Sequence, residues 1–101
     1  MEITLLYFDD CPSWKTADDR LAEAVVGRDD VHLTRRRVTT PEEAVRLGFH
    51  GSPSILVDGV DPFAEPGADT GLACRIYRTP EGPAGSPTVG QLRDALAAAS
   101  R

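Results

Sequence analysis

The chain has 101 residues, a hydrophobic fraction of 41% and a formal net charge of −5. This length predicts a single domain over residues 1–101, and the acidic balance argues against a nucleic-acid partner, because phosphate binding needs a clustered basic surface. The chain lacks an apolar stretch of membrane-spanning length and a signal-peptide pattern, so we expect a cytoplasmic protein whose two cysteines are thiols.

The first third of the chain predicts a strand, a helix and a second strand. Residues 2–8 are apolar and β-prone, which is typical of a short buried strand. Pro12 suits the first position of a helix with one apolar face, and Gly27 suits its left-handed cap. Residues 31–38 predict a more exposed strand, and the arginines at 35–37 are more typical of a protected sheet edge than of an anion-binding patch.

A short helix and a third strand follow. Thr40 and Glu43 have the spacing of a capping box, in which each side chain accepts a hydrogen bond from the other residue's backbone N–H, and Gly48 ends the helix. Ser54–Val57 is apolar and β-branched enough for a strand, and Asp58-Gly59 is a turn pair.

The last third begins with residues 60–71, a Pro- and Gly-containing loop that is long enough to suggest a function. Residues 73–78 predict a fourth strand, and residues 79–85 predict a turn region. Either Ser86-Pro87 or Thr88 with Gln91 opens a final helix.

The predicted order is therefore β-α-β-α-β-β-α. Strand, helix and strand imply a parallel pair with a right-handed crossover, and the two later strands would form an antiparallel hairpin. This order predicts an α/β domain with one mixed four-stranded sheet and helices on both of its faces.

Cys11 lies where the first strand gives way to the first helix. The start of a helix has free backbone N–H groups and a partial positive charge, and both favour a thiolate. Lys15 acts in the same direction, whereas Asp9 and Asp10 oppose it. We expect a reactive thiol here rather than a cysteine that acts only as a small apolar residue.

The element order, Cys11 and Pro53 together resemble the thioredoxin superfamily in its minimal, glutaredoxin-sized form. The segments LLYFDDCPSW, GFHGSPSILVDG, DPFAEPG and GLACRIYRTPEG are similar to a group of small bacterial thioredoxin-like proteins. Some members of that group are selenoproteins, and some are described as alkylmercury lyases. The resemblance covers essentially the whole chain.

The resemblance implies a role for several residues. Cys11 matches the attacking cysteine, and Pro53 matches the cis-proline that faces it, with Ser52 and Ser54 beside it in the groove lining. Trp14 stands where the second cysteine of C-x-x-C would be, and it is either helix core or a cover over Cys11. The resemblance therefore implies monothiol chemistry, in which an external thiol resolves a mixed disulfide.

Cys74 is the candidate second thiol, as a resolving cysteine or a second metal ligand. If strands three and four pair antiparallel, Pro53 lies opposite Tyr77 or Arg78, which puts Cys74 roughly 10–13 Å away at about 3.3 Å per residue. A disulfide needs Cα atoms within about 7 Å, so this geometry favours a core role for Cys74 unless a bulge or the 60–71 loop brings it closer.

Three other side chains have weaker assignments. His50 precedes Pro53 by three residues and could act as an acid or base, although a lone exposed histidine is the simpler interpretation. His32 is expected on the surface of a strand. Phe63 is expected to tether its loop rather than to contact a partner.

The leading hypothesis is a thioredoxin-fold protein with thiol–disulfide activity through Cys11 and no cofactor. Its partners would be a low-molecular-weight thiol or a protein disulfide. The alternatives are a non-catalytic binding module that uses the same groove, and a thiol protein that binds a soft metal or a mercurial through Cys11, with or without Cys74.

Overall fold

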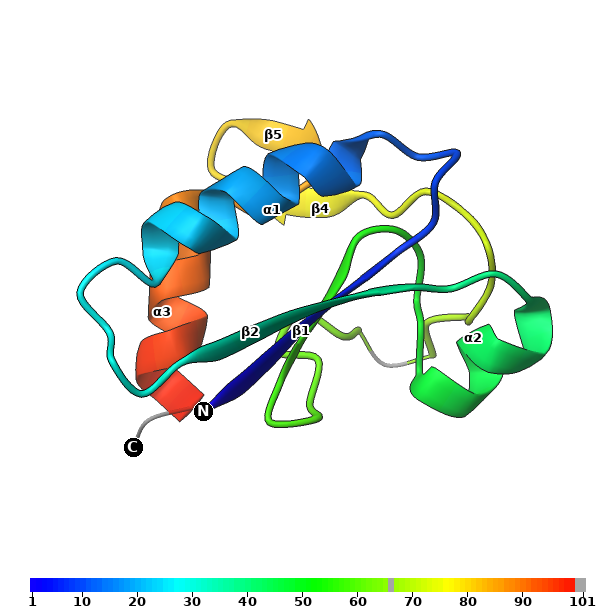
Figure 1. Cartoon of the computed structure of the whole chain (residues 1–101). Coiled ribbons are helices and arrows are strands. Elements are labelled where there is room, and N and C mark those ends of the chain that lie inside the picture. Colours follow the sequence, from blue (N-terminus) through cyan, green and yellow to red (C-terminus); the bar gives the residue numbers. More distant parts are fainter. Residues whose placement is uncertain (66, 100–101) are drawn as a thin grey trace.

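The computed structural model describes residues 1–65 and 67–99. It is an α/β domain with a mixed sheet, a separate β-hairpin and helices (Figure 1). The elements along the chain are β1 (Glu2–Tyr7), α1 (Ser13–Ala24), β2 (His32–Arg37), α2 (Pro41–Leu47), β3 (Ser54–Val57), β4 (Tyr77–Thr79), β5 (Gly82–Ala84) and α3 (Val89–Ala99). Within the described residues, no helix is both long and apolar enough to cross a membrane.

The main sheet has the strand order β2-β1-β3. The crossover through α1 makes β2 parallel to β1, whereas β3 is antiparallel to β1, with Ile3 opposite Val57. The predicted parallel pair is therefore confirmed. Strand β2 lies at the edge of this sheet, and its arginines at 35–37 each form an ion pair with an acidic side chain, which agrees with a protected edge rather than an anion-binding patch.

Side chains of β1 alternate between two apolar clusters, one on each face of the sheet. Ile3 and Leu5 pack with the buried side of α1 and α3, including Leu21 and Leu92. Leu6 points to the opposite face and packs in the cluster that contains Ala44 of α2. Figure 1 shows α1 and α3 side by side and α2 at the far end of the sheet. The prediction of helices on both faces is confirmed.

Side-chain caps fix two helix starts. Glu43 N–H donates to the Thr40 hydroxyl at 3.1 Å, as predicted, but the Glu43 carboxylate accepts from the Thr39 N–H rather than from Thr40. The bond from the Thr39 N–H, together with Arg36 and Arg46, lowers the pKa of the Glu43 carboxyl. At α3, Thr88 and Gln91 cap each other reciprocally, so the second of the two predicted starts is confirmed.

The prediction of a fourth strand in the main sheet is wrong: among the residues that the structure describes, this sheet has three strands. Residues 73–76 are not part of a named strand, and β4 covers only Tyr77–Thr79. It pairs antiparallel with β5 in a separate two-stranded sheet, with Thr79 opposite Gly82. The Pro- and Gly-rich residues 79–85 predicted a turn throughout. They form the tip of a tight hairpin, and β5 lies among them, so this strand had no signal of its own in the sequence.

Candidate functional site

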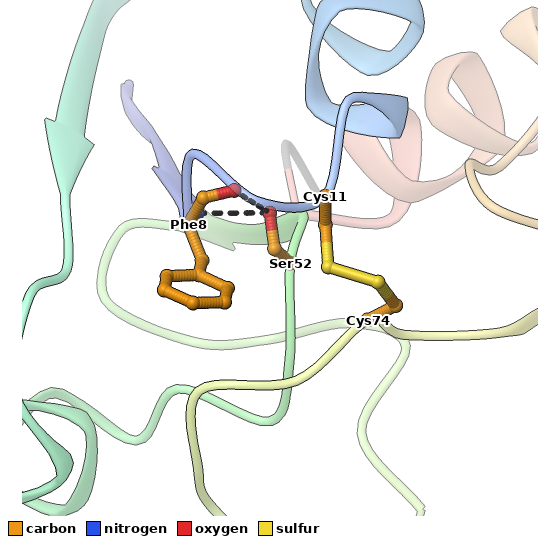
Figure 2. The surroundings of a disulfide bond; sticks show 4 residues. All are labelled: Phe8, Cys11, Ser52 and Cys74. Carbon is orange, nitrogen blue, oxygen red and sulfur yellow. Dashed lines mark hydrogen bonds between the residues drawn. A yellow bond between two sulfur atoms is a disulfide. The ribbon is translucent and has the colours of Figure 1, made fainter.

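A disulfide joins Cys11 and Cys74, which are 63 positions apart in the sequence (Figure 2). Their Cα atoms are 5.6 Å apart, inside the range that a disulfide requires. Cys11 lies in the turn between β1 and α1, where its N–H donates to the Phe8 carbonyl at 3.1 Å. Cys74 lies in the extended segment before β4. The expectation of separate thiols, with Cys74 in the core of a fourth strand, is wrong.

The direction of the segment around Cys74 explains this error. Ser52 N–H donates to the Ala73 carbonyl at 2.7 Å, and Arg75 N–H donates to the Ser52 carbonyl at 3.0 Å. These two bonds form a parallel bridge that places Cys74 directly opposite Ser52. The sequence estimate assumed an antiparallel pairing that put Pro53 opposite Tyr77 or Arg78, and this assumption moved Cys74 too far from Cys11.

Gly51 permits the close approach of the two segments. Its φ is +108°, a region that L side chains rarely adopt. A Cβ built there would lie 3.0 Å from the Arg75 Cβ and 3.2 Å from the Ala73 carbonyl oxygen. A larger residue at this position would push the Cys74 segment away from Ser52.

The Ser52-Pro53 peptide bond is cis, as predicted. The Ser52 hydroxyl accepts from the Phe8 N–H at 2.9 Å, so it connects the proline turn to the turn that carries Cys11 (Figure 2). The Ser54 hydroxyl donates to the Gly51 carbonyl at 2.7 Å. Both serines are fully buried, and they brace the backbone behind the disulfide rather than line an open groove.

The two halves of the disulfide differ in exposure. Cys11 is 3% exposed, whereas Cys74 is an exposed residue. A pocket of about 540 Å³ lies on the Cys74 side, and its lining includes Cys74, Ile76, Tyr77 and His50 but not Cys11. His50 therefore lies at this pocket, with its Nδ1 at 3.1 Å from the Asp69 carbonyl oxygen. Of the two halves of the disulfide, Cys74 is therefore the one that faces solvent.

Arg75 anchors the segment next to Cys74. Its guanidinium pairs with the Asp61 carboxylate at 2.7 Å, and both side chains are nearly buried, at 10% and 6% exposure. It also donates to the Phe63 carbonyl and the Ser54 hydroxyl. A buried pair with this many hydrogen bonds holds Arg75, next to Cys74, against Asp61 and Phe63.

Aromatic side chains complete the surroundings. The Tyr77 hydroxyl donates to the Pro53 carbonyl at 2.5 Å, and burial raises the pKa of Tyr77, so the donor stays protonated. Phe63 packs edge-on against Tyr77 and against the core, which confirms that it tethers its loop. Trp14 stacks on Tyr7 with ring centroids 4.2 Å apart and packs against the same core, as the helix-core interpretation predicts.

Sequence reasoning gave no role to Asp61, Arg75 or Tyr77. All three belong to segments that carry the family resemblance, DPFAEPG and GLACRIYRTPEG, and that was the only available signal. His32 is exposed on β2, as expected.

The described residues also form a second pocket, and they contain no cluster of metal ligands. A larger pocket of about 710 Å³ lies between the end of β3 and α3, lined by Val57, Phe63 and Ala95 among others, and it contains none of the predicted site residues. Within residues 1–65 and 67–99, no group of three or more His, Cys, Asp or Glu side chains could hold a metal ion.

Comparison with protein-family models, with curated proteins and with solved structures found no match to this chain.

Proposed function

We propose that this chain is a thioredoxin-like thiol–disulfide oxidoreductase whose redox centre is the pair Cys11 and Cys74. The observation that carries the proposal is the juxtaposition of the two cysteines beside Pro53, with one half of the disulfide open to a pocket. This arrangement replaces the monothiol mechanism expected from C-P-S-W, because Cys74 supplies the resolving thiol that Trp14 cannot.

Several local features support exchange at this disulfide. Cys11 precedes the first turn of α1, whose N–H groups favour a thiolate, and the opposing charge of Asp9 is offset by Arg37 at 2.9 Å. Cys74 is accessible, and thiol–disulfide exchange requires access to one sulfur. In the cytoplasm, which we propose as the location, low-molecular-weight thiols would hold the pair largely reduced between turnovers.

The test is turnover of a small disulfide, bis(2-hydroxyethyl) disulfide, by glutathione in the presence of the protein. A dithiol centre predicts that Cys11→Ser and Cys74→Ser each slow turnover severalfold, because glutathione must then resolve the mixed disulfide without the second protein thiol. A monothiol mechanism through Cys11 predicts that Cys74→Ser keeps the wild-type rate. Absence of turnover by the wild-type protein would contradict the proposal and leave the binding-module hypothesis, in which neither cysteine is needed.

The short distance between the cysteines also favours a second candidate function, binding of one soft metal ion by the reduced pair. Two thiolates whose Cα atoms are 5.6 Å apart can reach the same Hg²⁺ ion. The reduced wild-type protein should then bind one Hg²⁺ per chain more tightly than either single-cysteine variant, as measured by competition with dithiothreitol. Equal affinity of the variants would exclude a shared site.

A further inference from the structure

The exposure of Cys74 bears on which sulfur of the disulfide an external thiol attacks and which sulfur leaves. We infer that Cys74, and not Cys11, is the sulfur that an external low-molecular-weight thiol attacks, and that Cys11 is the leaving thiolate. This inference rests on the proposed redox function, and it reverses the roles that the sequence resemblance implied for the two positions.

The two cysteines differ in how accessible they are to an external thiolate. A thiolate attacks a disulfide sulfur in line with the S–S bond, from the side opposite the leaving sulfur. Cys11 is 3% exposed, although it lies in the turn between β1 and α1. Cys74 is exposed, and Figure 2 shows it on a separate segment that reaches Cys11 from the other side of the bond. Of the two cysteines, only Cys74 is an exposed residue, and it also lines the pocket.

The stability of the leaving group is the second argument. Exchange is faster when the departing sulfur is the more stable thiolate. Cys11 precedes the first turn of α1 by two residues, and Arg37 pairs with the neighbouring Asp9. Cys74 belongs to an extended segment and has no helix start beside it. Access and leaving-group stability therefore select the same sulfur.

The pocket beside Cys74 indicates the class of thiol. Its volume of about 540 Å³ is in the usual range of small-molecule sites, roughly 300–1,000 Å³. Ile76 and Tyr77 give it an apolar side, whereas His50 and Arg78 give it polar groups. A small thiol with polar substituents, such as a cysteine-containing peptide, fits this lining.

In the proposed exchange, each new S–S bond forms as another S–S bond breaks. The external thiolate forms a bond to the Cys74 sulfur, the bond between the two protein sulfurs breaks, and the electron pair leaves on the Cys11 sulfur. A second external thiolate attacks the external sulfur of this mixed disulfide and releases the Cys74 thiolate. Two external thiols are oxidised to one disulfide, and the protein disulfide is reduced to two thiols. In the reverse direction the same intermediate makes Cys74 the attacking thiol.

The experiment uses the oxidised 101-residue chain and glutathione. The reaction is stopped by acid within its first turnover, and the glutathione adduct is located by peptide mass spectrometry. The inference predicts the adduct on Cys74, with at least about tenfold less on Cys11. An adduct mainly on Cys11 would overturn the inference and leave the redox function intact. A folded protein whose disulfide glutathione does not open would overturn both.

A second pair of variants tests the pocket. Ile76→Trp places a larger side chain in its lining, whereas Val45→Trp changes an exposed residue of α2 outside it. The rate of adduct formation should fall severalfold in Ile76→Trp and stay unchanged in Val45→Trp. Equal rates in the two variants would show that the thiol does not enter through this pocket.

Discussion

The three-stranded sheet and the described part of the segment 58–76 (residues 58–65 and 67–76), which follows β3, are held in place by different kinds of interaction. The sheet is stabilised by buried apolar side chains such as Leu5, Leu21 and Ile55, which recur at strand and helix spacing. Within residues 58–65 and 67–76 no side chain is fully buried, and only a few apolar ones, such as Phe63 and Leu72, pack against the clusters. The position of these residues depends also on the Arg75–Asp61 ion pair and on the bond between Cys74 and Cys11.

This difference shows where chemistry can be placed in a small domain. The sheet has a large apolar core on both faces, so local changes at one end need not unfold it. The segment 58–76 has a few specific anchors, and one of them is a bond that a thiol can break. A redox centre in such a segment can open and close while the sheet remains folded.

The largest expected effect on the free energy of unfolding comes from breaking the nearly buried Arg75–Asp61 ion pair, in contrast to an exposed ion pair of the same chain. Arg75→Met leaves the nearly buried carboxylate of Asp61 without its partner, so we expect a loss of about 3–5 kcal/mol in the free energy of unfolding. The measurement is chemical denaturation of the oxidised protein. Arg78→Met is the matched control, because Arg78 is 88% exposed and 3.8 Å from Glu65, and it should change stability by less than about 0.5 kcal/mol. Equal effects of the two substitutions would contradict a structural role for the buried pair.

Reduction of the disulfide should have the next largest effect. The bond closes a loop between residues 63 positions apart, so reduction should lower the free energy of unfolding by about 2–4 kcal/mol. Hydrogen exchange should locate the change. The N–H groups of Ser52 and Arg75, which form the bridge next to Cys74, should lose protection, whereas those of β1 and β2 should keep it. Equal loss across the sheet would mean that the two regions are not separable.

A smaller effect is expected at the hydrogen bond between β4 and the proline turn. Tyr77→Phe removes the donor to the buried Pro53 carbonyl and should cost about 1–3 kcal/mol, measured by denaturation. Tyr7→Phe keeps the ring that stacks on Trp14 and is the matched control, with a much smaller expected cost. If both substitutions had the same small effect, the Pro53 contact would contribute nothing to stability.

The smallest expected effect is a dependence on alkaline pH. Burial raises the pKa of Tyr77 above the ordinary tyrosine value of about 10, so the unfolded chain loses this proton at lower pH than the folded protein does. The stability contributed by the neutral phenol is complete below about pH 10 and is lost as the pH rises through the folded-state value. The slope of unfolding free energy against pH above 10 should be shallower in Tyr77→Phe than in the wild type. An unchanged slope would exclude Tyr77 as the titrating group.

The sequence was sufficient to predict the elements with periodic apolar side chains. The bounds of β3, the capped starts of α2 and α3 and the burial of Leu21 and Leu92 follow from local pattern and cap chemistry. Cys11 was singled out by its place between the first strand and the first helix, whereas the cis peptide bond before Pro53 came from the family resemblance. The structure contains that cis bond.

The partner of Cys11 could not be predicted in the same way. Residues 58–76 have no apolar period from which to infer a register, and their path depends on Gly51, Asp61 and Arg75, which are far apart in the sequence. The residues around Cys74 are equally compatible with a parallel bridge to Ser52 and with an antiparallel strand. The two pairings differ by several residues in the position that they place next to Pro53, and therefore in the distance from Cys74 to Cys11. Specific long-range polar contacts decide between them.

The most direct test of the account is a redox titration of the Cys11–Cys74 pair in the folded protein. The protein is equilibrated in glutathione buffers of increasing reducing strength, free thiols are trapped by alkylation, and circular dichroism follows the fold. A redox centre predicts a reversible two-electron transition that is complete while the circular dichroism spectrum remains native. A disulfide that opens only as the protein unfolds would mean that the bond is structural, and it would contradict the proposed function.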